Sequence, residues 1–439
     1  MRTPVIIAIV LGLFLLDSCR KSDYLIEPGA LTLIDSGNGT GTVTWTKDLK
    51  YVLEGLVFVN DGQILTIKPG TVVRFRPGQA ENSSALIVAR GGKIIAEGTR
   101  EEPIVFTVEG DDLNGSIPLE SRGLWGGVIV LGNAPLNVEG GESFIEGIPF
   151  SEPRIVFGGT DEKDNSGTLK YVSIRHGGTN IGDGNEINGL TLGGVGSETT
   201  IDYVEVISNE DDGIEIFGGN VNLKHLIVAY CGDDAFDYDL GWSGNGQFWL
   251  GIQAPYLGDK LIEAGGGTNP VDGQPFSLPN IYNTTLYAKG NSSANPVVAF
   301  ENNAGGTIAN SIILNNNKGI VLQETDQQHD SFHQWEAGNL ALRNNLFHQV
   351  AGNAANEVFK ISGIASDQHK TIWSSYFLQA KNQILDPQLT NSKNNFLPKT
   401  KLNVSLAEYP NNWFQQVTFI GAFGEDNWVD GWSALSEIE

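Results

Sequence analysis

The chain has 439 residues, of which 40% are hydrophobic, and its 52 acidic against 27 basic residues give a formal net charge of -25. This length suffices for one large core or for two domains. The charge argues against nucleic acid as a partner, and against direct docking on anionic lipid or polyanionic glycan without a bridging cation. No glycine-rich loop between a strand and a helix supports nucleotide binding.

The first 19 residues predict a lipoprotein signal peptide. An uncharged apolar run at residues 4–16 (PVIIAIVLGLFLL) is too short to span a bilayer. The next letters, LDSC at residues 16–19, resemble the lipobox of bacterial lipoproteins, in which the cysteine is lipidated after cleavage. We expect lipidation at Cys19 and an outer-membrane or cell-surface location, with the lipid anchor as the sole membrane contact. A plain secretory signal is the alternative.

Residues 20–48 are rich in Gly, Ser, Thr and Asp and are expected to form a tether. From residue 49 to about 380, short apolar segments alternate with Gly, Pro or charged turns. They lie at residues 65–73, 85–88, 93–96, 104–108, 124–131, 155–157, 169–174, 190–192, 201–207, 223–228, 281–287, 308–314 and 340–347. Segments this short and this regularly interrupted predict an all-β chain. One segment, residues 326–338 (DQQHDSFHQWEAG), is expected to form a helical excursion.

A repeat identifies the architecture. Residues 201–219 can be laid over residues 223–241 at an offset of 22, so that Asp211 and Asp212 align with Asp233 and Asp234, and Glu215 aligns with Asp237. A repeat this short, in which apolar residues alternate with polar ones, predicts successive coils of a parallel β-solenoid. Like positions later in the chain hold asparagines, which we expect to stack as a structural ladder: Asn283, Asn310 and Asn344.

Several phrases carry a family resemblance. The run at residues 65–75 (LTIKPGTVVRF), with those at 85–107 and 123–132, resembles the opening coils of right-handed parallel β-helix proteins. The phrases DDGIEIFGG, FDYDLG and GQFWLG, with the closing FIGAFGEDNWVDGWSAL, resemble a broad group of secreted β-helix proteins of Bacteroidota-type bacteria. The resemblance implies a single-stranded right-handed parallel β-helix over residues 49–380. Residues 381–439 are expected to cap the last coil, because an open solenoid end exposes its core and strand edges.

The acidic register allows three interpretations. Carboxylates of Asp211, Glu215, Asp233 and Asp237 could bind Ca²⁺, which prefers such hard oxygen ligands. Alternatively, residues 209–214 (NEDDGI) and 232–234 (GDD) resemble motifs of polygalacturonase-like glycoside hydrolases, which implies catalytic roles for Asp212, Asp233 and Asp234. The downstream G-H-G and R-x-K motifs of those enzymes are missing. The third interpretation is that these side chains cap turns and remain solvated.

Aromatic residues follow the acidic coils and suggest a ligand platform. We predict that Trp242 stacks on a sugar ring while Asp237 and Asp239 orient hydroxyls. The predicted function is a glycan-binding or adhesion module of the cell envelope, with calcium as its one candidate cofactor. A glycoside hydrolase or lyase acting on acidic polysaccharide is the alternative, and for a lyase the nearby bases are Arg175 and Lys224. A purely structural envelope protein is the third class.

Overall fold

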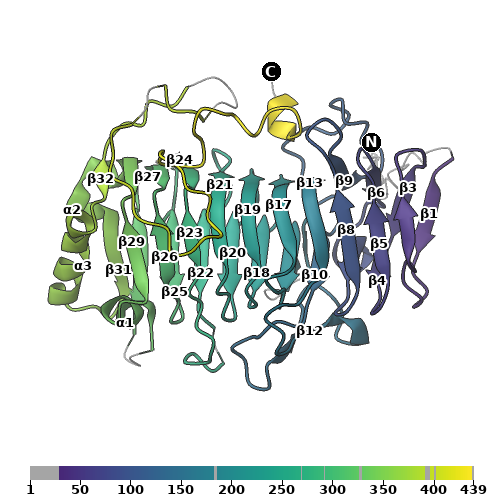
Figure 1. Cartoon of the computed structure of the whole chain (residues 1–439), viewed down its shortest axis with the longest axis horizontal. Coiled ribbons are helices and arrows are strands. Elements are labelled where there is room, and N and C mark those ends of the chain that lie inside the picture. Colours follow the sequence, from purple (N-terminus) through teal and green to yellow (C-terminus); the bar gives the residue numbers. More distant parts are fainter. Residues whose placement is uncertain are drawn as a thin grey trace, which may run out of the picture.

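The computed structural model describes residues 29–181, 185–267, 269–290, 292–325, 329–390, 396–399 and 402–437. The predicted signal peptide, the lipidation site at Cys19 and the first part of the predicted tether lie outside these residues. The chain winds into a right-handed parallel β-helix whose strands stack along one long axis (Figure 1). The predicted fold class is therefore confirmed. Among the described residues, no helix combines the length and the apolar character needed to cross a bilayer.

Each coil passes through three faces. Strands of the first face are β2 (Val43–Trp45), β5 (Ile64–Ile67), β8 (Lys93–Glu97), β23 (Asn280–Tyr282), β26 (Gly306–Ala309) and β29 (Leu340–Arg343). Those of the second face are β1 (Leu31–Ile34), β3 (Tyr51–Glu54), β6 (Val72–Phe75), β9 (Ile104–Val108), β24 (Thr285–Gly290), β27 (Ile312–Asn316), β30 (Leu346–Val350) and β32 (Gln383–Ile384). In the middle of the solenoid, single long strands bend across both faces: β13 (Gly167–Arg175), β17 (Thr200–Ile207), β19 (Asn222–Ala229) and β21 (Asn245–Ile252).

The third face is a separate ten-stranded parallel sheet. Its strands are β4 (Leu56–Val59), β7 (Ala85–Val88), β10 (Val128–Leu131), β16 (Leu190–Gly193), β18 (Ile214–Phe217), β20 (Phe236–Asp239), β22 (Ile262–Gly265), β25 (Val298–Glu301), β28 (Ile320–Glu324) and β31 (Phe359–Gly363). The predicted 22-residue register is confirmed, since Ile201 pairs with Leu223, and Glu215 with Asp237. Inward side chains of all three faces form one continuous apolar core.

One residue with positive φ makes the corner between the first and second faces in successive coils. These residues are Tyr171, Tyr203, His225, Phe248, Asn283, Asn310 and Asn344, with φ between 48° and 61°. Asparagine tolerates this left-handed conformation better than most residues. The predicted asparagine ladder is thus confirmed, and its members are buried. In the preceding coils the corner is an aromatic stack, in which the Tyr203 ring lies 4.3 Å from Tyr171 and 4.1 Å from His225.

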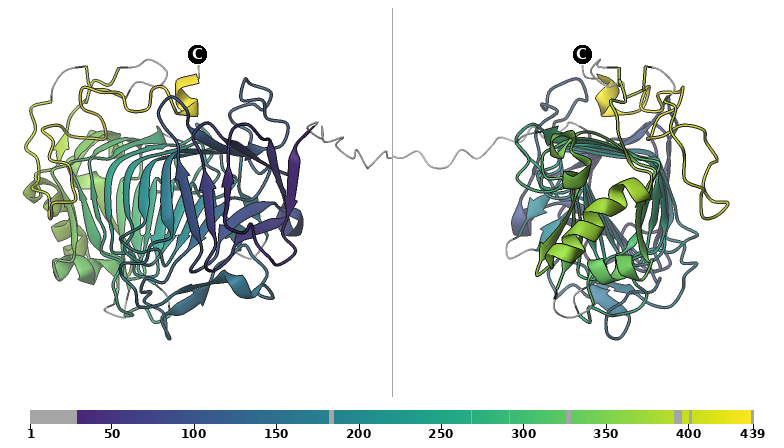
Figure 2. Two further views of the ribbon diagram at one scale, coloured as in Figure 1. Left: turned by 45° about the vertical axis from the view of Figure 1, so that its right-hand side comes forward. Right: turned by 90° about the vertical axis from the view of Figure 1, so that its left-hand side faces the viewer.

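The two ends of the solenoid differ from the expected arrangement. Residues 31–45 are not tether, because β1 pairs in parallel with β3 and β2 with β5, so the first coil begins at β1. At the other end, the last coil is covered by α2 (Ala355–Val358) and α3 (Asp367–Gln379), not by the segment after residue 381 (Figure 2). Trp373 of α3 stacks 4.9 Å from Phe359, which seals the core there. The predicted helical excursion is confirmed where described, as α1 (Ser331–Glu336).

The expected C-terminal cap is instead a strap, residues 402–437, that returns along the second face (Figures 1 and 2). The asparagine ladder fastens it, since Asn344 donates to the Ser405 carbonyl and Asn310 to that of Ala407, both at 3.0 Å. Apolar side chains on the outside of β17, β19 and β21 pack against Trp428 and Trp432 of the strap. The strap ends in η4 (Ala434–Glu437). Its path covers apolar surface that would otherwise face water.

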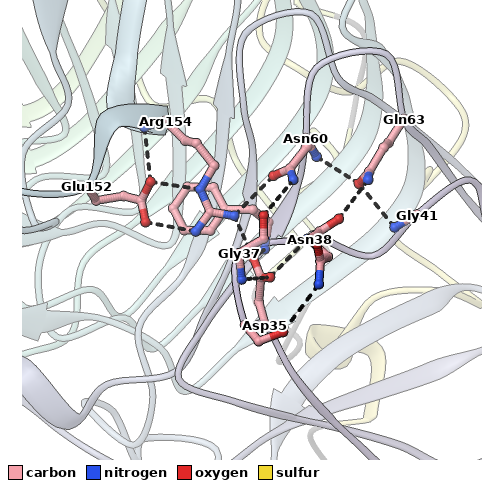
Figure 3. Close-up of polar contacts among 11 residues, drawn as sticks. Asp35, Gly37, Asn38, Gly41, Asn60, Gln63, Glu152 and Arg154 are labelled. Atoms are coloured by element: carbon pink, nitrogen blue, oxygen red, sulfur yellow. Dashed lines mark hydrogen bonds and ion pairs between the residues drawn. The ribbon is translucent and has the colours of Figure 1, made fainter.

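An insertion after β10 spans residues 132–165 and carries β11 (Glu142–Phe144), η2 (Pro153–Ile155) and β12 (Val156–Gly158). Arg154 attaches it to the first coils, as Figure 3 shows: its guanidinium contacts Glu152 through two nitrogens at 2.7 Å and Asp35 at 2.7 Å. The same group lies 3.7 Å above the Phe58 ring. The remaining short elements are η1 (Ala80–Asn82), β14 (Thr179–Asn180), β15 (Glu186–Ile187) and η3 (Ala351–Asn353).

Candidate functional site

Carboxylates gather where the turn after the second face enters the third face. We call them the acidic cluster: Asp211, Asp212, Glu215, Asp233, Asp234, Asp237 and Asp259. The pairing of β18, β20 and β22 produces this arrangement, because it places Glu215, Asp237 and Glu263 side by side on the outer surface of the third face. Alternation along each strand sends their neighbours Ile214, Phe236 and Ile262 into the core.

Three overlapping groups of carboxylates form within the cluster. In each group, one oxygen per residue lies within 4.8 Å of the others. The groups are Asp211 with Asp212 and Asp233, Asp212 with Glu215 and Asp237, and Asp233 with Asp234 and Asp259. Asp212, Glu215 and Asp234 are buried, Asp211 and Asp237 are half-buried, and Asp233 is exposed. The cluster therefore has a buried layer against the sheet and an outer layer open to solvent.

Two members cap turns, as the third interpretation of the sequence predicts, but they are buried and not solvated as it expected. Asp212 accepts the backbone N–H of Asp234 at 2.8 Å, and Asp234 in turn accepts the N–H of Lys260 in the next coil. Each cap uses one carboxylate oxygen. Asp234 is only 2% exposed, which leaves it no access to a polysaccharide chain.

Crowding and burial disfavour ionisation of Asp212 and of the carboxyls that surround it. Burial, together with the neighbouring carboxylates, raises the pKa values of Asp212, Glu215, Asp234 and Asp237 well above their usual range. Burial, with Glu186 and Asp233 nearby, raises the pKa of Asp211 to about 8. Oδ1 of Asp237 is a buried oxygen without a hydrogen-bond partner among the residues that the structure describes.

Glu146 from the insertion completes one side of the cluster. Burial raises its pKa to about 7, although the hydrogen bond from the Glu215 carboxyl opposes that rise. The amide of Asn188 contacts both carboxyl groups. Simultaneous ionisation of Glu146 and Glu215 is therefore disfavoured, because two adjacent buried carboxylates repel each other.

Lys260 is a basic residue in contact with the cluster. Its ammonium lies 2.5 Å from Asp259, 2.6 Å from Glu263 and 3.6 Å from Asp234. Burial alone would lower the pKa of this amine, but the three carboxylates outweigh burial and raise it. Lys260 is therefore a fixed cation and cannot serve as a general base near neutral pH.

The bases considered for a lyase lie away from this arrangement. Arg175 is 5% exposed and its guanidinium bonds Ser173 at 2.8 Å, beside the buried Glu205. Lys224 donates to the Trp413 carbonyl of the strap at 3.2 Å and lies 4.4 Å from that indole ring. Neither is placed to take a proton from a ligand at the cluster.

The predicted aromatic platform is wrong. Trp242 is fully buried: its indole N–H donates to the Val221 carbonyl at 3.1 Å, and its ring packs against Tyr238 and Trp249 in the core. Glycine at 244 fits beside the inward ring, since a Cβ there would lie 1.9 Å from the Val221 carbonyl oxygen and 2.7 Å from the indole nitrogen. Asp237 and Asp239, predicted to orient hydroxyls, do lie on the outer surface of the third face.

The structure divides the acids predicted for metal binding between two groups: Asp211 and Asp233 lie in one, Glu215 and Asp237 in the other, and Asp212 belongs to both. It also brings together those predicted for catalysis, although Asp234 is committed to its turn. Sequence reasoning missed Asp259, Glu263 and Glu146. A signal existed for Glu263, because it follows Ile262 as Glu215 follows Ile214. The spacing from Asp237 to Glu263 is four residues longer than the 22-residue repeat, so the match was missed. No local pattern marks Glu146, which arrives from the insertion.

Comparison with known proteins identifies the family. A family model described as a pectate-lyase-like β-helix domain matches residues 37–383. No curated protein matches the sequence. Among solved structures, the chain resembles a pectin methylesterase from Aspergillus niger at 11% identity, over 81% of this chain and 97% of that one, with a TM-score of 0.26. That likeness is too weak to carry an argument. The family match spans most of the chain, which therefore belongs to the pectate-lyase-like β-helix family.

Proposed function

We propose that this member of the pectate-lyase-like β-helix family binds an acidic polysaccharide on the outer surface of its third face, through divalent cations held by the acidic cluster. The observation that carries the proposal is the gathering of seven carboxylates in three overlapping groups, two of which share Asp212. Uncompensated, they would repel both one another and a polyanionic chain. A bound cation offsets both repulsions, because it can bind protein and sugar carboxylates together.

The spacing of the oxygens fits a calcium ion. Ca²⁺ lies about 2.3–2.6 Å from each oxygen ligand, so two ligands on opposite sides of one ion are about 5 Å apart. The oxygens of each group lie within 4.8 Å of one another. Asp211, Asp212 and Asp233 would hold the outer ion, and Asp212, Glu215 and Asp237 the inner one. Within the described part of the chain, Asp237 Oδ1 has no hydrogen-bond partner that would compete with the ion. The ion would supply positive charge for sugar carboxylates.

Binding is favoured over lyase chemistry by the state of the basic groups. A lyase needs a residue that can accept a proton from the sugar, and Lys260 is held as a cation by three carboxylates. A second candidate, glycoside hydrolysis, is supported by one observation. Burial and mutual repulsion raise the pKa values of Glu146 and Glu215, which favours one protonated carboxyl beside an ionised one, and such enzymes use a protonated and an ionised carboxyl.

We also propose that Cys19 is lipidated and holds the protein at the outer membrane or cell surface, where polysaccharide would reach it. A structural role in the envelope without any ligand is the remaining alternative. It predicts no saturable binding of polysaccharide under any ionic condition.

The experiment measures binding of de-esterified polygalacturonate by affinity electrophoresis, in millimolar Ca²⁺ and in EDTA. We expect retardation in Ca²⁺ that falls at least tenfold for Asp212→Asn, while Asp61→Asn, an exposed carboxylate in a distant turn, matches wild type. Parallel digests are assayed for reducing ends and for unsaturated products. Calcium-independent retardation that Asp212→Asn leaves unchanged contradicts the proposal, and new reducing ends that vanish with Glu146→Gln would establish the hydrolase.

A further inference from the structure

The N-terminal end of the solenoid exposes apolar side chains. β1 lies at one extreme of the long axis, and no strand precedes it among the described residues (Figure 1). Leu31 of β1 pairs with Tyr51, and Val43 of β2 pairs with Leu65; both partners are core residues. Leu31 and Val43 therefore face the same way as the core, yet they are 47% and 36% exposed because no earlier coil covers them.

These side chains surround an apolar cup of about 280 Å³, whose lining includes Leu33, Trp45 and Tyr51. Ile34 and Leu49 also line it and are 68% and 55% exposed. Five of the exposed large apolar side chains in the described part of the chain fall within residues 31–64. Apolar side chains gathered in this way mark a surface that contacts another apolar body.

The strand edges at this end are closed on one face of the solenoid. The loop of residues 35–42 crosses the third face, where the Thr40 N–H donates to the Phe58 carbonyl at 2.7 Å and the Asp35 carboxylate accepts the Phe58 N–H at 3.3 Å. Within the described residues, β1 pairs with β3 alone and β2 with β5 alone. Their outer edges need water or polar headgroups as partners, so this end fits a membrane interface and not the hydrocarbon interior.

Two acidic side chains at this end are paired with arginines. Asp35 lies 2.7 Å from the Arg154 guanidinium, as Figure 3 shows, and Glu54 lies 3.2 Å from that of Arg76. The formal net charge of -25 belongs to the whole chain. Pairing reduces the repulsion that these two carboxylates would exert on lipid headgroups.

The opposite end of the solenoid is sealed by α3. Trp373 of this helix is fully buried and stacks on Phe359 of the last coil. Leu378 of the same helix is 70% exposed, which matches Ile34 at the open end. The two ends therefore differ in whether the core is covered, and each offers an apolar side chain of the same exposure.

The open end is also the end that follows the proposed lipid anchor. Nine residues, 20–28, separate Cys19 from Gly29, where the described chain begins. Fully extended, they would reach about 35 Å at most. Four of the nine are charged, which suits them poorly to cover apolar side chains themselves. The anchor therefore holds this end of the solenoid close to a bilayer.

We infer that the open N-terminal end of the solenoid docks on the lipid bilayer, with Leu31, Ile34 and Leu49 at the boundary between headgroups and acyl chains. The inference rests on the proposed lipidation of Cys19 and adds a second membrane contact to the anchor. Because the anchor already confines the end to the membrane surface, a modest apolar contact is sufficient. End-on docking leaves the acidic cluster, on the side of the solenoid, open to polysaccharide.

The test places a fluorescent reporter at each end of the solenoid. Ile34→Cys and Leu378→Cys introduce thiols at sites of matched exposure, whereas Cys231 is buried and an acylated Cys19 has no free thiol. Each full-length lipoprotein is labelled with an NBD group and reconstituted in phosphatidylcholine vesicles, with or without a nitroxide on the acyl chains. The nitroxide should reduce emission from residue 34 about twofold or more and leave emission from residue 378 unchanged.

Leu49→Cys provides a second reporter at the open end, should be quenched like Ile34→Cys, and decides the matter if circular dichroism shows that Ile34→Cys is unfolded. Equal emission changes at residues 34 and 378, or no quenching at residues 34 and 49, would overturn the inference. Energy transfer between labels at residue 34 of two copies, without quenching by the nitroxide, would also overturn it and would assign this end to a second copy.

The outcome for the anchor is measured separately by flotation of the unlabelled protein with the vesicles. Protein that does not float refutes lipidation at Cys19. Docking is then decided by the same labelled variants with a histidine tag in place of residues 1–19, held on nickel-chelating lipid. Quenching at residue 34 alone supports docking there, and its absence contradicts docking whatever the state of Cys19.

Discussion

Replacing Asp212 by Asn should stabilise the metal-free protein at pH 8, although Asp212 is buried and caps a turn by accepting a backbone hydrogen bond. The side-chain oxygen that accepts the Asp234 N–H at 2.8 Å remains in Asn. What disappears is one charge within 4.8 Å of several other carboxylates. At an effective dielectric constant of about 20, two unit charges at that distance repel by about 3 kcal/mol. Partial protonation reduces this value, so we expect a gain of about 1–3 kcal/mol.

The pH dependence of the wild type has a definite sign. Because the folded state raises these carboxyl pKa values, it binds more protons than the unfolded chain, and its stability falls as pH rises through the folded values. Those values are about 7 for Glu146 and about 8 for Asp211. For Glu146 the change from 4.5 corresponds to about 3 kcal/mol. The stability of metal-free wild type should therefore decrease between pH 5 and pH 8.

The assay is thermal unfolding in EDTA and in excess Ca²⁺, at pH 5.5 and pH 8. A chain of this size changes its melting temperature by about 1 °C per kcal/mol. In EDTA at pH 8 we expect Asp212→Asn to melt about 1–3 °C above wild type. Calcium at 100 times its dissociation constant should raise the melting temperature of wild type by about 3 °C, and that of Asp212→Asn by much less. Asp61→Asn is the control. A variant that melts below wild type in EDTA, or a wild type indifferent to both pH and Ca²⁺, would refute the reasoning.

Three further predictions concern other parts of the chain. Asn310→Ala should lower the free energy of unfolding in urea by about 2–3 kcal/mol, because it removes two hydrogen bonds to Ala407 and places alanine at φ 55°. Asn310→Gly should lower it less, because glycine adopts this φ without strain. Equal stability of Asn310→Ala and wild type would contradict the prediction. Cys231 is 4% exposed, and burial raises the pKa of its thiol to about 12. Ellman's reagent at pH 8 should therefore label this thiol at least 100-fold more slowly in folded than in unfolded protein. Rapid labelling of Cys231 in folded protein would contradict its burial. Cys19→Ser should abolish incorporation of labelled fatty acid and release the protein from membranes, whereas unchanged incorporation would exclude lipidation at this residue.

The coil register could be predicted from the sequence because it depends on local alternation. The offset between Ile201 and Leu223 is also the pairing between β17 and β19, and the three asparagines occupy one corner. Acidic side chains at like positions then had to meet. The prediction of acidic positions fails where the repeat length changes. Four extra residues precede Asp259, so the third acidic coil does not align at the 22-residue offset.

What could not be predicted depends on contacts between distant segments. The strap reaches Glu205 from Ser433 and Ala434, more than 220 residues later, and no periodicity marks that contact. The direction of the Trp242 ring depends on space left by glycine in the same turn, not on alternation alone. Residues 31–45 looked like tether because residues 20–48 are rich in Gly, Ser, Thr and Asp, yet β1 and β2 are held by backbone pairing to the next coil.

The most direct test of the proposed function is anomalous diffraction from crystals grown with millimolar Ca²⁺ and trigalacturonate. The account predicts an anomalous peak about 2.3–2.6 Å from carboxylate oxygens of Asp212 and its neighbours, with a sugar carboxylate completing the coordination of the outer ion. Well-ordered crystals under these conditions that show no peak at the acidic cluster, or a sugar bound there without any cation, would contradict it.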